Sequence, residues 1–211
     1  IDSMPKRSKP SQAPRSRTDL GINAIWLMPI FPSPSYHGYD VTDYMTVNPQ
    51  YGTLDEFQNL ISEAHKRGIH VILDFVINHT SDQNPWFVAA QDPSSEYHDW
   101  YIWSQTDPGY AGPWNEQVWN KASNGLYYYS VFWSGMPDLN YRNSAVTDQI
   151  EKIAKYWLID MNVDGFRVDG ARHLIEDGKT QVNTAETMDW FAKFRAMYKS
   201  WKPIAMTVGD I

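Results

Sequence analysis

The sequence contains no cysteine, which excludes a disulfide framework and a thiolate metal site. It also lacks any run of about 18 apolar residues, so we expect no membrane-spanning helix and no membrane partner. The absence of cysteine assigns no compartment, and the localisation stays open. What is present is an ordinary globular composition over 211 residues, 42% hydrophobic and 20% charged, long enough to bury a core without cross-links.

Basic residues are scarce outside the first seventeen positions. The rest of the chain holds 13 basic against 24 acidic residues, and such an acidic body argues against a nucleic-acid partner. Residues 1–18 are rich in Pro, Ser, Lys and Arg, and we interpret them as a disordered or non-native basic segment rather than a nucleic-acid-binding arm. The basic residues of this segment are Lys6, Arg7, Lys9, Arg15 and Arg17.

Aromatic residues are plentiful, at 15% of the chain, with 10 Trp and 13 Tyr. They fit a buried core, and they also fit surfaces that stack against sugars, because pyranose C–H faces pack on rings as other apolar groups do. Composition alone favours the core.

Short apolar runs alternate with helical patterns from Asn23 onward. A capping box of Thr53 and Glu56 opens the first helix, Gly68 ends it, and Ser144 is the expected cap of the second. This alternation predicts right-handed βα units and a parallel sheet, either open or closed into a barrel. The apolar runs that predict strands are 23–28, 69–73, 163–168 and 203–208, and the helical patterns cover 54–64, 144–158 and 187–199.

Residues 80–143 differ from the rest, with many aromatics, Pro, Gly and Asn and little periodicity. A stretch of this length is usually a functional loop or a subdomain, and we expect it to leave from the end of the strand at 69–74. The predicted organisation is therefore a body formed by 19–79 and 144–211, with 80–143 as an insertion.

Three predicted strands end in polar residues, where parallel α/β folds gather reactive groups. The ends are Asp74, the Arg167–Asp169 pair and Asp210. Arg167 and Asp169 lie two apart on a strand, so they point to the same side, and the guanidinium would favour the charged form of Asp169. An ionised carboxylate is the nucleophile of retaining glycosidases. A structural ion pair at a barrel mouth is the alternative.

Four motifs, in this order, resemble conserved segments of the α-amylase superfamily (glycoside hydrolase family 13), with a pattern closest to bacterial α-amylases. The resemblance covers about residues 20–211. It implies a partial (β/α)8 TIM barrel, holding about strands two to five, with a B-domain-like insertion after the third strand at 80–143. The motifs are HGYD at 37–40, DFVINH at 74–79, MPDLN at 136–140 and GFRVDGARH at 165–173.

The resemblance implies that Asp169 is the catalytic nucleophile and that Arg167 fixes its charge and position. The family's acid/base is a Glu at the end of the fifth strand, where this chain has Asp210. Its side chain is one methylene shorter, and a misplacement of about 1 Å can cost about 100-fold in rate.

The resemblance also implies substrate-binding residues. Tyr39 would stack beneath the sugar, with a core tyrosine as the alternative, and His79 would hydrogen-bond that sugar. Asp40 would bind sugar hydroxyls or else cap backbone groups in its loop. The remaining positions are His37, which could equally be a surface histidine, and the pair Arg172 and His173 on the leaving-group side.

Asn78 matches a calcium ligand of many family members, with structural hydrogen bonding as the alternative. Calcium is therefore a candidate cofactor, and no organic cofactor is implied. The first strand and a late Asn-His-Asp segment of the family have no counterpart here, so we expect the chain to be truncated at both ends.

The function that the resemblance implies is retaining hydrolysis of α-1,4-glucosidic bonds in starch and maltooligosaccharides. The partner would be an α-glucan. The alternatives are an α-glucosidase or transglycosidase of the same superfamily, and an impaired fragment that binds α-glucan without cleaving it.

Overall fold

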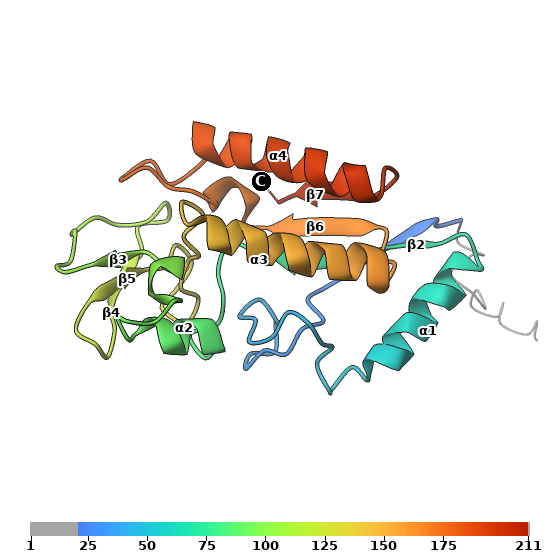
Figure 1. Cartoon of the computed structure of the whole chain (residues 1–211), viewed down its shortest axis with the longest axis horizontal. Coiled ribbons are helices and arrows are strands. Elements are labelled where there is room, and N and C mark those ends of the chain that lie inside the picture. The colour runs from blue at the N-terminus through green and yellow to red at the C-terminus, as the bar shows by residue number, and fades with distance from the viewer. Residues whose placement is uncertain (1–20, 211) are drawn as a thin grey trace, which may run out of the picture.

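A four-stranded parallel sheet forms the centre of the chain, in a computed structural model that describes residues 21–210 (Figure 1). The basic segment 1–18 lies outside the described residues. All four predicted strands are confirmed, and each pairs in parallel with the next in the order β1-β2-β6-β7. Their bounds are β1 Ala24–Leu27, β2 His70–Val76, β6 Gly165–Asp169 and β7 Met206–Gly209.

Three helices accompany this sheet: α1 (Leu54–His65), α3 (Ser144–Lys155) and α4 (Ala185–Trp201). The predicted capping box opens α1. The predicted cap of α3 is wrong by one residue, because the Asn143 side chain accepts the hydrogen bond from the Ala145 amide at 3.0 Å. The helix α4 begins earlier than predicted, since Thr184 caps it.

One face of the sheet is buried against the helices. The Phe75 ring stacks on Phe166 with centroids 4.4 Å apart and lies 6.5 Å from Phe194 of α4. The indole of Trp190 on α4 donates to the Thr147 hydroxyl of α3 at 2.9 Å, which joins the two helices that run side by side in Figure 1. This packing fixes the orientation of β2 and β6, and therefore of their other face.

The opposite face of the sheet is open and carries the polar strand residues. Side chains alternate along a strand, so Asp74, Arg167 and Asp169 all lie on this face. Apolar side chains on the same face are exposed, with Trp26 at 47% and Met206 at 51%. The open face therefore combines a charged cluster with apolar surroundings.

The long segment between β1 and α1 is anchored to the core by Trp157. This residue lies in a π-helical turn, Tyr156–Asp160, that extends α3, and it is fully buried. Its indole donates to the backbone carbonyl of Tyr44 at 2.8 Å, and its ring packs on Phe31 and Phe57. The anchor holds the loop that carries Tyr39 near the sheet.

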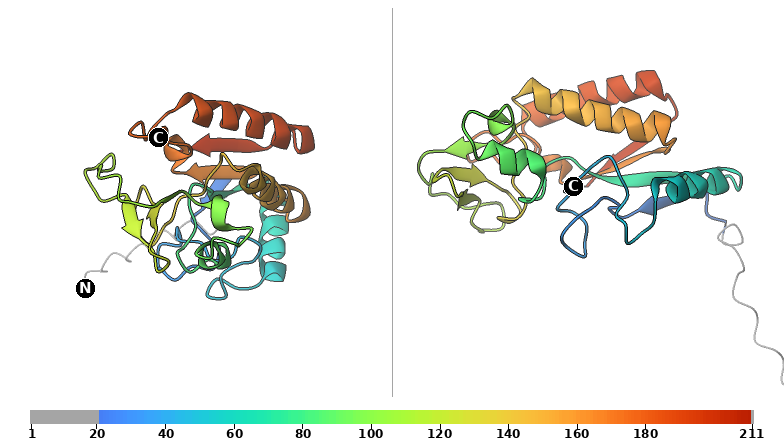
Figure 2. Two further views of the ribbon diagram at one scale, coloured as in Figure 1. Left: turned by 60° about the vertical axis from the view of Figure 1, so that its left-hand side comes forward. Right: turned by 60° about the horizontal axis from the view of Figure 1, so that its bottom comes forward.

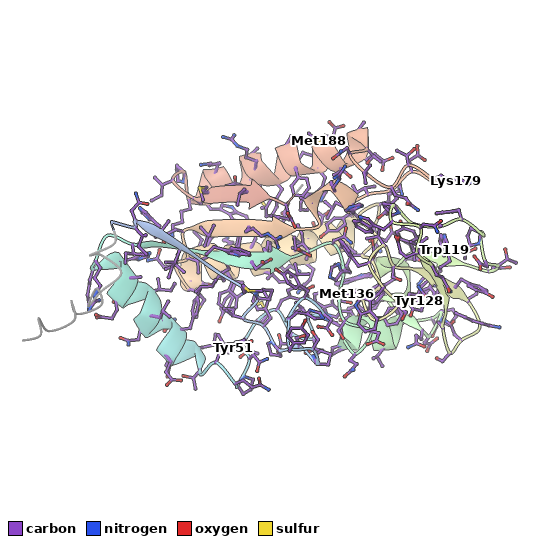
Figure 3. The ribbon with its side chains drawn as sticks, turned by 180° about the vertical axis from the view of Figure 1, so that it is seen from behind. Tyr51, Trp119, Tyr128, Met136, Lys179 and Met188 are labelled. Carbon is purple, nitrogen blue, oxygen red and sulfur yellow. The ribbon has the colours of Figure 1, made fainter. Side chains whose placement is uncertain are left out.

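The segment between β2 and α3 contains more structure than its sequence pattern predicts. Its three short strands form an antiparallel sheet in the order β3-β5-β4, near the labelled Trp119 and Tyr128 in Figure 3. The right-hand view of Figure 2 shows this region at one end of the molecule. Its elements are α2 Pro85–Ala90, the 3-10 turn His98–Trp100, β3 Trp103–Ser104, β4 Trp119–Lys121 and β5 Tyr127–Tyr129.

This segment packs against the rest of the chain. Phe87 of α2 packs in the main core, with Tyr101 and Tyr128 each 4.9 Å away. The division at residues 80 and 143 therefore stays a prediction.

Between residues 21 and 210, none of the helices is both long enough and apolar enough to cross a membrane.

Gly165, the first residue of β6, allows β7 to approach closely. A Cβ atom at this position would lie 1.8 Å from the backbone oxygen of Met206. We expect Gly165→Ala to separate β6 from β7, which is severe core damage and should cost about 4 kcal/mol of stability. A loss of this size lowers the melting temperature by about 10 °C or more. The matched control is Gly68→Ala, which has φ +66° and open space around it, and should cost only about 1–2 kcal/mol. Equal shifts for the two variants in thermal unfolding would contradict this explanation.

Candidate active site

The polar ends of β2, β6 and β7 meet at the guanidinium of Arg167. Its Nη1 donates to Asp169 at 2.8 Å and to Asp74 at 3.0 Å, while Nη2 donates to Asp210. The side chain of Asp74 has no exposed surface, that of Asp169 is 15% exposed, and that of Asp210 is 53% exposed. One cation therefore organises three carboxylates, and the cluster is an anionic site that favours developing positive charge.

Asp169 has one oxygen held and one free. Arg167 binds Oδ1, and no residue in the described part of the chain hydrogen-bonds Oδ2. Burial raises the pKa of Asp169, Arg167 acts against this rise, and the nearby Asp210 adds to it. The expectation that Arg167 favours the charged form holds for its own contribution, but burial has the larger effect.

Asp74 is a buried carboxyl group that positions other residues of the site. Burial raises the pKa of Asp74 to about 6, against the opposing effect of Arg167. Its Oδ2 accepts hydrogen bonds from Arg167 and, at 3.1 Å, from the hydroxyl of Tyr39. Because its side chain is inaccessible, Asp74 positions its neighbours and does not meet a substrate.

Tyr39 lies beside the charged cluster, and its stacking beneath a sugar stays a prediction. Burial raises the pKa of its hydroxyl to about 12, and the negative charge of Asp74 adds to the effect. The Arg167 guanidinium lies 5.9 Å from the Tyr39 ring centroid and 5.3 Å from that of Trp26. Trp26 was missed by the sequence analysis, although the two-residue alternation along 24–27 places it on this face.

The two predicted histidines near Tyr39 face protein groups. His79 is 1% exposed, its Nε2 lies 3.1 Å from the backbone oxygen of Tyr39, and Nδ1 lies 3.5 Å from the Asn78 amide nitrogen. Burial lowers the pKa of His79 to about 4, so its ring is neutral and Nε2–H is the donor to Tyr39. His37 accepts from the Tyr39 amide at 3.1 Å. Both histidines hold Tyr39 in place, and their contact with sugar stays a prediction.

Asp40 is held by serine hydroxyls of its own loop. Its carboxylate is buried and accepts hydrogen bonds from the hydroxyls of Ser33, at 2.5 Å, and Ser35. Both bonds use Oδ1, and the binding of sugar hydroxyls or of backbone groups by Asp40 stays a prediction.

Arg172 is predicted to lie on the leaving-group side of the site, and that role stays a prediction. It lines a cavity of about 280 Å³ on the helix-covered side of the sheet, between Val168 and the α4 residues Met188 and Phe191. The left-handed Gly170, with φ 60°, ends the strand alternation and turns the chain toward α4.

His173 is also turned away from Arg167. It is 3% exposed, and its Nδ1 lies 2.9 Å from the backbone oxygen of Gln181. Its ring packs between Phe132 and Trp114 of the insertion, at 5.7 and 5.3 Å. His173 therefore borders the insertion, and the role of Arg172 and His173 on the leaving-group side stays a prediction.

Calcium has one matching oxygen in this structure. Asn78 Oδ1 is buried without a partner, but its amide nitrogen donates to Asp138 at 2.9 Å, and the other Asp138 oxygen accepts from the Val131 amide. Calcium takes 6–8 oxygen ligands, and residues 21–210 hold no cluster of three or more His or acidic side chains able to bind a metal. The donor set does not fit by itself, so calcium stays a prediction and enters no step below.

Asp138 and Glu176 form a buried acidic pair that the sequence analysis did not single out. Burial raises the pKa of Asp138 well above its ordinary value and that of Glu176 to about 7, and each acts on the other. A neighbouring negative charge disfavours the ionised form of a buried carboxyl group. It joins the insertion to the segment after β6, and the separation of 38 positions gave no local sequence signal.

The comparisons with known proteins identify a family for this chain. Residues 18–211 match the family model described as the catalytic domain of alpha amylase. Alpha-amylase 3 of Dictyoglomus thermophilum is 48% identical over 194 residues, which is 92% of this chain and 36% of the relative. A trehalose synthase of Pimelobacter is 41% identical over 83% of this chain and 32% of the relative.

Solved structures give the same answer. An α-amylase from H. orenii superposes with a TM-score of 0.81 at 49% identity, covering 91% of this chain and 38% of that chain. The chain thus spans about a third of the relatives it matches. Its parallel sheet and helices are part of a TIM barrel, with β1, β2, β6 and β7 as neighbouring strands. The chain belongs to the α-amylase superfamily, glycoside hydrolase family 13, and carries part of its catalytic domain.

Proposed function

We propose that this chain supplies the nucleophile half of a retaining enzyme that cleaves α-1,4-glucosidic bonds in starch and maltooligosaccharides. The observation that carries the proposal is the state of Asp169, whose Oδ1 is fixed by Arg167 while Oδ2 is free on an open face. A retaining glycosidase needs a carboxylate in this state beneath the anomeric carbon.

In the first step, Asp169 Oδ2 attacks the anomeric carbon as the bond to the leaving oxygen breaks. Asp210 donates a proton to that oxygen, and a glycosyl ester forms. Arg167 keeps the attacking carboxylate in position, and the Tyr39 ring offers a face for the sugar. Water then attacks the anomeric carbon and gives a proton to Asp210, the bond to Asp169 breaks, and the product keeps the α configuration.

Asp210 is the proposed acid/base, and its surroundings differ from those of an efficient acid. A general acid is kept protonated by an apolar enclosure, whereas Asp210 is half exposed and paired with Arg167. This pairing favours a second candidate function, in which the chain binds α-glucan without cleaving it.

The two candidates are distinguished by incubating the chain with maltoheptaose and following the products by proton NMR. If the first candidate function is right, α-anomers appear as the initial products, before mutarotation. Binding in calorimetry without new reducing ends supports the second candidate, and β-anomers as the initial product would contradict a retaining mechanism. Relatives that include a trehalose synthase make transfer to another sugar a further product to look for.

A further inference from the structure

The insertion exposes Trp133, at 49%, and to a greater extent Trp114. Its exposed fraction is 60%, and it stacks on Phe132 at 5.8 Å with an angle of 28° between the rings. The ring of His173 also lies near Trp114, with the two ring centroids 5.3 Å apart. One part of the indole is therefore fixed to the protein while the rest is accessible.

The loop that carries Trp114 is held rigidly. The Trp114 amide donates to the Glu116 carboxylate at 2.8 Å, and the Gly112 amide donates to the Glu116 carbonyl at 2.8 Å. Asn115 adopts the left-handed conformation, with φ 66°, which fits a tight turn. Outside the turn, the Gln181 side chain donates to the Ala111 carbonyl at 3.3 Å and ties the loop to the segment after β6. One backbone hydrogen bond, one bond to the Glu116 carboxylate and one bond from the Gln181 side chain thus hold the loop that presents this apolar ring.

The position of this ring connects it to the candidate nucleophile. A Cβ atom on Gly170, the residue after Asp169, would lie 3.0 Å from the Phe132 ring, so Phe132 covers the backbone next to Asp169. The Phe132 ring also lies 5.1 Å from His79. Asp169, Gly170, Phe132 and Trp114 therefore follow one another along the border between β6 and the insertion.

We infer that Trp114 is a stacking platform for a glucose unit of an α-glucan next to the bond that is cleaved at Asp169. The inference rests on the proposed function and adds a binding residue to it. A rigid indole offers a large apolar face at low entropic cost, and the C–H face of a pyranose is apolar. Trp114 is the most exposed ring of this aromatic group, since His173 is 3% exposed and Phe132 is half-buried.

Calorimetry of maltoheptaose binding tests the inference on the chain as it stands. We expect Trp114→Ala to weaken the affinity about tenfold and Trp114→Phe, which keeps a smaller ring, to weaken it less. Maltose, which fills fewer positions, should lose less affinity than maltoheptaose. The matched control is Tyr51→Ala, since Tyr51 is 59% exposed and lies away from the insertion in Figure 3, and its affinity should not change.

The outcomes separate this inference from the proposed function. If the parent chain binds maltoheptaose and Trp114→Ala binds it with the same affinity, the role of Trp114 is overturned and the proposed function stands. No measurable binding by the parent chain would overturn both. If Trp114→Ala loses its cooperative thermal transition, Trp114→Phe decides, and an affinity equal to the parent's again overturns the inference.

Discussion

Asp169→Asn is expected to lower the rate of α-glucan cleavage by about 10⁴-fold or more, which is the scale seen when a catalytic nucleophile is removed. The amide has the size of the carboxylate and its oxygen can still accept the Arg167 hydrogen bond of 2.8 Å, so the site keeps its shape. Its oxygen cannot form a stable glycosyl ester. Maltooligosaccharide affinity should therefore survive while turnover is lost.

The measurement is the release of reducing sugar, paired with calorimetry of binding. The control is Asp189→Asn, which changes an exposed carboxylate on α4 and should leave both quantities unchanged. Parent-level turnover by Asp169→Asn would remove Asp169 from the mechanism.

Arg167→Met is expected to lower the stability of the fold by about 3–5 kcal/mol, because it leaves a buried charge without its partner. Asp74, with no exposed side-chain surface, loses its guanidinium and keeps the Tyr39 hydroxyl. The pKa of Asp74 is already raised to about 6 by burial, and loss of Arg167 raises it further.

The sign of the pH dependence follows from this raised pKa. The unfolded chain ionises Asp74 near its ordinary value, so the folded variant becomes less stable as the pH rises through the folded pKa. Thermal unfolding between about pH 5 and pH 8 should show the deficit of Arg167→Met shrinking as the pH falls.

The matched control for this variant is Arg67→Met. Arg67 is 53% exposed and pairs with Glu63 on α1, and such a surface pair contributes about 0–1 kcal/mol. A melting temperature for Arg167→Met equal to that of Arg67→Met would show that Arg167 does not neutralise the buried Asp74.

The strand residues of the site could be predicted because alternation is a local property. Arg167 and Asp169 lie two apart, so their shared side followed from the sequence. The meeting of Asp74 and Asp210 at the Arg167 guanidinium depends on how the strands pair. The register that sets Asp74 opposite Arg167 and Arg167 opposite Val208 is a long-range property that no local pattern contains.

The sequence predicted least where the backbone leaves regular structure. The place of Arg172 beside α4 does not follow from its continuous motif, because the left-handed Gly170 ends the strand alternation before it. The bonds to Asp40 from serine hydroxyls five and seven positions earlier follow no sequence pattern. The strands of the insertion are two or three residues long, too short for periodicity to show.

The central claim, that Asp169 is the nucleophile, is tested most directly by trapping the glycosyl-enzyme. A 5-fluoro-α-glucosyl fluoride carries a leaving group that departs without protonation, so the result does not depend on Asp210. After incubation, digestion and mass spectrometry, the account expects one fluoroglucosyl group on the peptide that contains Asp169, and none in Asp169→Asn. A label on another residue, or no label on the parent chain, would contradict it.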